Sequence, residues 1–215
     1  MKIFRPYVIF LIFMANRIFA DELVASSVDV KSVSKKNSTY ILEEMSRQAS
    51  KTINQLINEY SLPLYDMYFE KVGQQAKTYP LHKKYIDVFK KATLLVEDVR
   101  ISYSPYLNQA MNKVAMTDCN TLYFPTDSFV DAVKEGNKIT EKQMKLLLHE
   151  IGHSQQCQKT SRKIYAQRWF SELSPATIAA LKAGKIDVKM IHDAMPLEKE
   201  AEIFSKNMYL EVIKH

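Results

Sequence analysis

The spacing of apolar side chains predicts a mostly helical protein. Between residues 39 and 60, apolar residues recur at three- and four-residue steps with polar residues between them, a pattern typical of an amphipathic helix. Pro63 and Pro80 interrupt the pattern, so we expect separate helices over residues 64–75 and 81–95. Further helical patterns follow at residues 106–115, 162–173, 175–183 and 196–213.

Two short runs rich in β-branched and aromatic residues predict strands. Residues 98–103 and 121–124 are bounded by proline and polar side chains, and we expect them to pair as a small sheet. The predicted fold class is therefore mainly α with a small β-sheet (α+β). We expect a helical region at residues 39–95, packed as one globular unit with a domain at residues 96–215.

The first 20 residues have the features of a secretory signal peptide. Lys2 and Arg5 form a basic start, an apolar run extends from Tyr7 to Ala15, and Ala20 stands at the expected cleavage position. The run is shorter than the roughly 20 apolar residues that span a bilayer. We expect cleavage after residue 20, a flexible leader at residues 21–38 and a periplasmic or secreted protein without stable membrane insertion. An uncleaved membrane anchor is the alternative.

Charge and glycine content argue against nucleic acids and nucleotides as ligands. The whole chain has a formal net charge of +6, but removal of residues 1–20 lowers the number of basic residues from 30 to 27, against 24 acidic ones. A nearly balanced chain carries no charge signal for nucleic acid. The 4 glycines lie far apart in the sequence, so no glycine-rich phosphate-binding loop is predicted.

A capped helix is predicted from residue 140 onward. Residues 140–143, Thr-Glu-Lys-Gln, form a capping-box sequence, which marks a helix start. An apolar stripe of helical periodicity follows, formed by Met144, Leu147, Leu148 and Ile151. Gly152 costs about 1 kcal/mol relative to alanine inside a helix, which indicates that another part of the chain approaches its backbone closely.

His149, Glu150 and His153 form the minimal signature of a helical zinc hydrolase. At a spacing of i and i+4, the two imidazoles share one helix face and can bind one tetrahedral Zn²⁺ ion. Glu150 is turned by about 100° around the helix axis. It is therefore predicted to act as the general base toward water and not as a ligand. The alternative is an ordinary pair of histidines on an amphipathic helix.

A third protein ligand must come from further along the chain. Lys159 stands where the third histidine of a metzincin would lie, which excludes that class. Glu172 follows His153 with 18 residues between them, a spacing that resembles the aminopeptidase branch of the gluzincins. Glu198 is the other candidate, because Glu198 and Glu202 form an acid-x-x-Ala-acid pattern. This pattern resembles zinc peptidases in which the first acid binds the metal and the second supports a histidine.

The two cysteines allow three interpretations. In an oxidising compartment Cys119 and Cys157 can form a disulfide, and otherwise they are expected to be buried small apolar side chains. Cys157 also lies one helical turn beyond His153, where a thiolate ligand would favour a closed structural site over a catalytic one.

From about residue 99 to 205 the chain resembles a bacterial family of zinc metallopeptidase domains of unknown function. These domains occur alone in exported proteins and as the core domain of extracellular contractile injection system cargo. The matching segments are residues 99–101, 115–124, 146–156, 166–169 and 196–202.

That resemblance implies a minimal gluzincin-like architecture and a site completed by a Pro-x-Glu-x-Glu-Ala element. It therefore implies Glu198 in preference to Glu172 as third ligand, with Gln156 at the family's usual glutamine position three residues after the second histidine. The alternative for Glu198 is an acid favoured by the dipole at a helix start. Cys119 and Cys157 replace a glycine and a glutamine of the family, and residues 21–95 have no counterpart in it.

These observations predict an exported zinc metallopeptidase that hydrolyses a protein or peptide substrate with metal-activated water. Zn²⁺ would be held by His149, His153 and Glu198, and Glu150 would pass a proton from the water to the leaving amine. The alternative is a non-catalytic zinc-containing binding or structural module of the cell envelope or of an injection apparatus.

Two tyrosines are further candidates for the same site. Tyr165 and Tyr209 are candidates for stabilising an oxyanion, although tyrosines more often serve in packing. His192 is expected to be an ordinary core or surface histidine.

Overall fold

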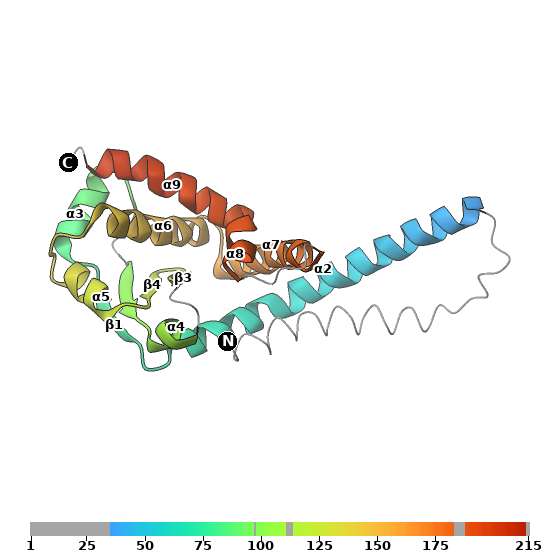
Figure 1. The fold of residues 1–215 in the computed structure, drawn as a ribbon, viewed down its shortest axis with the longest axis horizontal. Coiled ribbons are helices and arrows are strands. Elements are labelled where there is room, and N and C mark those ends of the chain that lie inside the picture. The colour runs from blue at the N-terminus through green and yellow to red at the C-terminus, as the bar shows by residue number, and fades with distance from the viewer. Residues whose placement is uncertain (1–34, 97, 111–113, 183–187, 214–215) are drawn as a thin grey trace. The chain divides into compact units, whose positions relative to one another are not determined.

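The computed structural model describes residues 35–96, 98–110, 114–182 and 188–213 (Figure 1). The predicted signal peptide and residues 21–34 of the predicted leader lie outside them. The chain divides into two compact units, residues 1–60 and 61–215. Within the described residues, no helix is both long and apolar enough to cross a membrane.

The first described helix, α2 (Lys35–Gly73), continues through Pro63, so the prediction of two helices separated there was wrong. Proline removes one backbone hydrogen bond and usually breaks a helix. Here a buried apolar stripe at helical spacing stabilises the helix beyond the proline; it consists of Tyr65, Phe69 and Val72. The Tyr65 ring packs against Phe69 at 4.6 Å and its hydroxyl donates to the Thr117 carbonyl at 3.2 Å. Tertiary packing thus outweighs the local signal.

A four-stranded mixed sheet follows, with the order β1-β2-β4-β3. The strands are β1 (Lys77–Pro80), β2 (Arg100–Tyr103), β3 (Met116–Asp118) and β4 (Thr121–Phe124). The predicted pairing of the two strand-like runs is confirmed, because β2 and β4 lie side by side in parallel register. The outer strands β1 and β3 pair antiparallel to them and were not predicted as separate strands.

Helices account for most of the remaining chain. They are α3 (Lys83–Lys91), α4 (Pro105–Ala110), α5 (Asp127–Lys134), α6 (Glu141–Gln158), α7 (Arg162–Lys182), α8 (Val188–Ala194) and α9 (Pro196–Val212). Helix α7 passes through Pro175, where two helices were expected, and neither α5 nor α8 was predicted. The predicted fold class, mainly α with a small sheet, is confirmed.

Helix α6 lies between the sheet and α9 (Figure 1). Its predicted apolar stripe is buried, since Leu147, Leu148 and Ile151 are fully enclosed in a core with Leu122 and Phe124 of β4. Each such side chain contributes about 1.5–3 kcal/mol when it is removed from water. Packing of this face fixes the rotation of α6 about its axis and turns the two histidines toward α9.

A disulfide joins Cys119 and Cys157. Cys119 lies in the turn between β3 and β4, and Cys157 is at the end of α6. The bond therefore ties strand β3 to the helix that carries the histidines. It also removes Cys157 as a thiolate ligand in this state of the protein.

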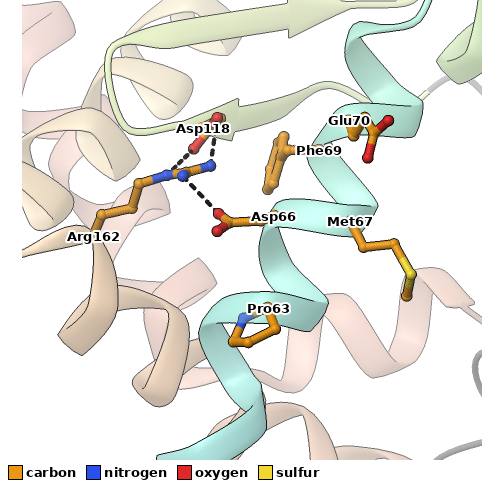
Figure 2. Close-up of a pocket in the computed structure, with 7 residues that line it drawn as sticks. All are labelled: Pro63, Asp66, Met67, Phe69, Glu70, Asp118 and Arg162. Carbon is orange, nitrogen blue, oxygen red and sulfur yellow. Dashed lines mark hydrogen bonds and ion pairs between the residues drawn. The ribbon is translucent and has the colours of Figure 1, made fainter.

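An ion-pair junction connects α2, β3 and α7 (Figure 2). Arg162 donates from Nε and Nη2 to the two carboxylate oxygens of Asp118 at 3.0 Å each, and its Nη1 lies 2.6 Å from Asp66 Oδ1. A shallow hollow of about 550 Å³ opens beside these groups, lined also by Pro63, Met67, Phe69 and Glu70. Because Asp66 and Asp118 are already paired with Arg162, we interpret the junction as a contact that holds residues 61–73 in place.

Candidate metal centre

Helix α6 places both motif histidines by local rules. The capping box is formed as predicted: Thr140 Oγ1 accepts from the Gln143 backbone N–H at 3.3 Å, and the Gln143 side chain accepts from the Thr140 N–H at 2.9 Å. The i, i+4 spacing then brings the rings of His149 and His153 to 4.8 Å, edge to face. The helix start and the spacing together determine where the imidazoles point.

Glu198 completes a group of three with these histidines. Its Oε2 lies 3.1 Å from His149 Nε2 and 3.2 Å from His153 Nε2, and the two nitrogens lie 3.2 Å apart. The three side chains are mostly buried, with 16%, 6% and 7% of their surfaces exposed. In the described part of the chain, this is the group of metal-binding side chains whose ligand atoms all lie within 4.8 Å of one another.

The triangle of ligand atoms has the dimensions of a tetrahedral zinc site. Bonds of about 2.0–2.1 Å at tetrahedral angles separate two ligand atoms by about 3.3 Å. The three observed separations, 3.1, 3.2 and 3.2 Å, are close to that value. Two imidazole nitrogens and one carboxylate oxygen are also a donor set found in catalytic zinc sites. This buried group can therefore bind a metal ion.

Close packing of two helices brings Glu198 to the histidines. Helices α6 and α9 run antiparallel, and Gly152 lies against Ala201 and Phe204 of α9. A Cβ atom at position 152 would lie 3.0 Å from Phe204 Cδ1 and 3.4 Å from the Ala201 Cα. The close approach that the sequence indicated at Gly152 is confirmed, and the approaching segment is α9.

Electrostatics favour a charged Glu198. Burial alone would raise the pKa of its carboxyl group, but hydrogen bonds from His149, His153 and His192 outweigh burial and hold the pKa below its usual range. Burial would likewise lower the pKa of His153, yet the hydrogen bond to Glu198 and the charges of Glu198 and Glu150 raise it. The metal-free site thus holds an anionic carboxylate between imidazoles that readily take up protons.

Gln156 determines which nitrogen of His153 faces the site. The Gln156 Nε2 donates to the Leu197 carbonyl and to Glu200 Oε2, both at 3.1 Å, which orients the amide. The Gln156 Oε1 therefore accepts from His153 Nδ1–H at 2.9 Å. Once the ring is neutral, as metal binding requires, its lone pair resides on Nε2. Nε2 is the atom that faces Glu198. The hydrogen bond from His153 to Gln156 therefore favours the tautomer that a metal-binding histidine requires.

Glu172, the alternative third ligand, lies elsewhere. Its Oε2 accepts from the backbone N–H of Leu197 at 2.7 Å and its Oε1 accepts from Arg168 Nε at 2.8 Å. Arg168 also donates to Glu200, which binds Gln156. Glu172 is thus part of a hydrogen-bonded chain that supports the start of α9.

Glu150 is buried beside strand β3. Only 3% of the residue is exposed, and its Oε2 accepts from Thr117 Oγ1 at 2.7 Å. This leaves Oε1 as the carboxylate oxygen without a hydrogen bond from Thr117. Glu150 is absent from the group of ligand atoms, as its position on the helix predicts.

Three further side chains, Glu202, Tyr165 and His192, lie near the site, whereas Tyr209 contacts Lys145. Glu202 Oε2 lies 3.8 Å from His149 Nδ1, an ion-pair distance that is longer than a hydrogen bond. Tyr165 is 4% exposed, and burial followed by the charges of Glu198 and Glu150 raises the pKa of its phenol. The Lys145 ammonium nitrogen lies over the ring of Tyr209, 4.8 Å from the ring centre. His192, expected to be an ordinary histidine, contacts Glu198 directly, with Nε2 3.1 Å from Oε1.

Sequence reasoning missed Thr117 and His192. Thr117 lies 33 positions before Glu150, and His192 lies on α8, a helix that was not predicted. Neither residue has a fixed spacing to the histidine pair, so no signal in the sequence pointed to its place in the site.

In comparisons with known proteins, no protein-family model, curated protein or solved structure matches the chain. The structure itself defines a mainly helical protein with a buried His-His-Glu group that can bind a metal ion.

Proposed function

We propose that this protein is an exported zinc-dependent metallopeptidase that hydrolyses peptide bonds in a protein or peptide substrate. The observation that carries the proposal is the arrangement of His149, His153 and Glu198 as a nearly equilateral triangle of ligand atoms, next to Glu150 on the same helix. A zinc ion held there would supply a Lewis acid that acidifies water and polarises a carbonyl oxygen.

The residues of the chain have separate tasks in this reaction. His149, His153 and Glu198 would hold the ion with three donor atoms, and Gln156 fixes the tautomer of His153. Thr117 holds one oxygen of Glu150 at 2.7 Å, so the other oxygen, Oε1, would accept a proton from water. Glu150 would then deliver this proton to the nitrogen of the leaving amine as the peptide C–N bond breaks.

The burial of Glu150 favours a second candidate function. With 3% of the residue exposed and one oxygen engaged by Thr117, Glu150 has little contact with solvent. A zinc-containing binding or structural module would tolerate this enclosure, whereas a peptidase must admit its substrate to the carboxylate. An acid at this position has no role in a purely structural site, however, and we therefore retain catalysis as the main proposal.

The test begins with metal analysis of the natively purified protein and with cleavage of an unbiased peptide library. We expect about one zinc ion per chain. Glu150→Gln should retain zinc, because the amide keeps the side-chain shape and an acceptor for Thr117. The same variant should lower hydrolysis by about 10²- to 10⁴-fold. If the wild type binds zinc and Glu150→Gln leaves every cleavage unchanged, the binding module is the better assignment.

The ligand assignment is tested by a matched pair of variants. Glu198→Gln should weaken zinc binding, because it removes the one anionic donor of the triangle. Glu172→Gln should retain zinc, since an amide oxygen still accepts from the Leu197 N–H. Loss of zinc from Glu172→Gln with full retention in Glu198→Gln would reverse the assignment.

A further inference from the structure

The two oxygens of the Glu198 carboxylate have different partners. Oε2 faces the Nε2 atoms of His149 and His153, whereas Oε1 lies 3.1 Å from Nε2 of His192. His192 belongs to α8, and its side chain is 28% exposed. The carboxylate is therefore held from two sides, and only one side faces the histidines of α6.

We propose that His192 is a positioning residue that holds Oε1 of Glu198, so that this carboxylate binds the metal through Oε2 alone. His192 takes this role only if the proposed metal site exists. The terminal torsion of a glutamate is broad and roughly two-fold, so an unrestrained carboxylate rotates freely between one-oxygen and two-oxygen binding. A donor on Oε1 occupies that oxygen and fixes the rotation. One coordination position then stays open for water.

The backbone around His192 is well placed to hold the imidazole. Its neighbours Ile191 and Met195 are buried, at 6% and 1% exposure, and the His192 carbonyl accepts from the Met195 N–H at 3.0 Å. The other ring nitrogen, Nδ1, lies 3.6 Å from Asp193 Oδ1, within reach of an electrostatic contact. Because Nε2 faces Oε1, a ring with its proton on Nε2 donates to the carboxylate.

A role for His192 as a fourth metal ligand is the competing interpretation. The group whose ligand atoms lie within 4.8 Å of one another contains His149, His153 and Glu198 but not His192. A fourth protein ligand would also close the tetrahedral site and leave no position for water. The position of His192 on the far oxygen of Glu198 supports the positioning role.

The test uses the full-length protein and three variants. His192→Ala removes the donor, His192→Gln restores one because its side-chain amide can donate at nearly the same place, and His82→Ala is the control. His82 is the N-cap of α3, where its Nδ1 accepts from the Lys84 N–H, and it is outside the site. Zinc and cobalt affinities are measured by competition with a chelator. The cobalt absorption spectrum and X-ray absorption report the coordination.

We expect His192→Ala to bind zinc about 10- to 100-fold more weakly, because removal of a side chain that hydrogen-bonds to a metal ligand usually has an effect of this size. Its cobalt spectrum should change as Glu198 adopts a different coordination, which a purely structural loss of stability would not produce. His192→Gln should recover most of the affinity and the wild-type spectrum, and His82→Ala should match the wild type throughout.

Four results would overturn the inference, and the first three concern His192 itself. Equal affinity and an unchanged spectrum in His192→Ala would show that Oε1 needs no donor, and failure of His192→Gln to recover either property would show that the hydrogen bond is irrelevant. Three histidine nitrogens on the metal by X-ray absorption would make His192 a ligand. Absence of metal binding in both the wild type and His82→Ala would instead refute the metal site itself, and the positioning role with it.

Discussion

Removal of the Cys119–Cys157 disulfide should destabilise the protein by an amount that can be derived from its place in the chain. The bond closes a loop with a sequence separation of 38 residues. Loop-closure entropy for that length predicts a loss of about 4 kcal/mol in the free energy of unfolding at 25 °C. This is a large share of the roughly 5–15 kcal/mol that stabilises a typical domain.

The backbone at Cys119 provides a second, smaller term. Cys119 has a φ of 47°, in the left-handed region, at the first position of the two-residue connection between β3 and β4. A side chain there costs roughly 1–2 kcal/mol, which glycine avoids. Two double variants are therefore informative. Cys119→Ala with Cys157→Ala should lose about 4 kcal/mol, and Cys119→Gly with Cys157→Ala should lose about 1 kcal/mol less.

Both numbers are measurable by chemical denaturation of oxidised wild type, reduced wild type and the two variants. Reduced wild type should unfold at nearly the same denaturant concentration as the alanine pair. Zinc should be measured in parallel, because the disulfide ties the strand that holds Glu150 to the end of α6. A loss below about 1 kcal/mol in the alanine pair would refute the loop-entropy reasoning. A glycine pair no more stable than the alanine pair would refute the strain at Cys119.

Two further outcomes follow from the site. Because the pKa values of His149 and His153 are raised in the metal-free protein, protons compete with zinc already above pH 6.5, and affinity should fall as pH decreases through the raised values. With two imidazoles to deprotonate, the fall should approach about 100-fold per pH unit in titrations with a chelator, and a pH-independent affinity between pH 5 and 8 would contradict it. Gly152→Ala should weaken zinc binding more than Gly136→Ala, because a Cβ at 152 pushes against α9, whereas one at 136, where φ is 70°, clashes with His82, outside the site. Equal affinities in these two variants would show that the spacing of α6 and α9 does not control the site.

The part of the fold that local signals encode was predictable. The capping box at Thr140 and the apolar stripe around Leu148 gave both the start and the buried face of α6, and Pro196 marked the start of α9. Pro63 and Pro175 were misleading, because each lies inside a continuous helix. Beyond Pro63, the helix is stabilised by packing against strands and helices distant in sequence, which a local pattern does not record.

The candidate site divides in the same way. The relative position of His149 and His153 was predictable from their spacing, because both lie on one helix. Glu198 is 49 positions from His149, and only the resemblance to a peptidase family, not any spacing rule, selected it over Glu172. His192 and Thr117 reach the site through tertiary contacts alone, so their roles could not be predicted before the fold was known.

The contrast between Glu172 and Glu198 shows how one helix start uses two acids. Helix α9 begins after Met195, which makes no side-chain capping hydrogen bond, so the first N–H groups of the helix need a partner from elsewhere. Glu172 supplies one by accepting from the Leu197 N–H, while Arg168 balances its charge. The Glu198 side chain points toward α6 instead, where close packing at Gly152 brings it to the histidines. Glu172, the candidate by spacing, thus caps the helix that carries Glu198, and Glu198 lies within 3.2 Å of both histidines.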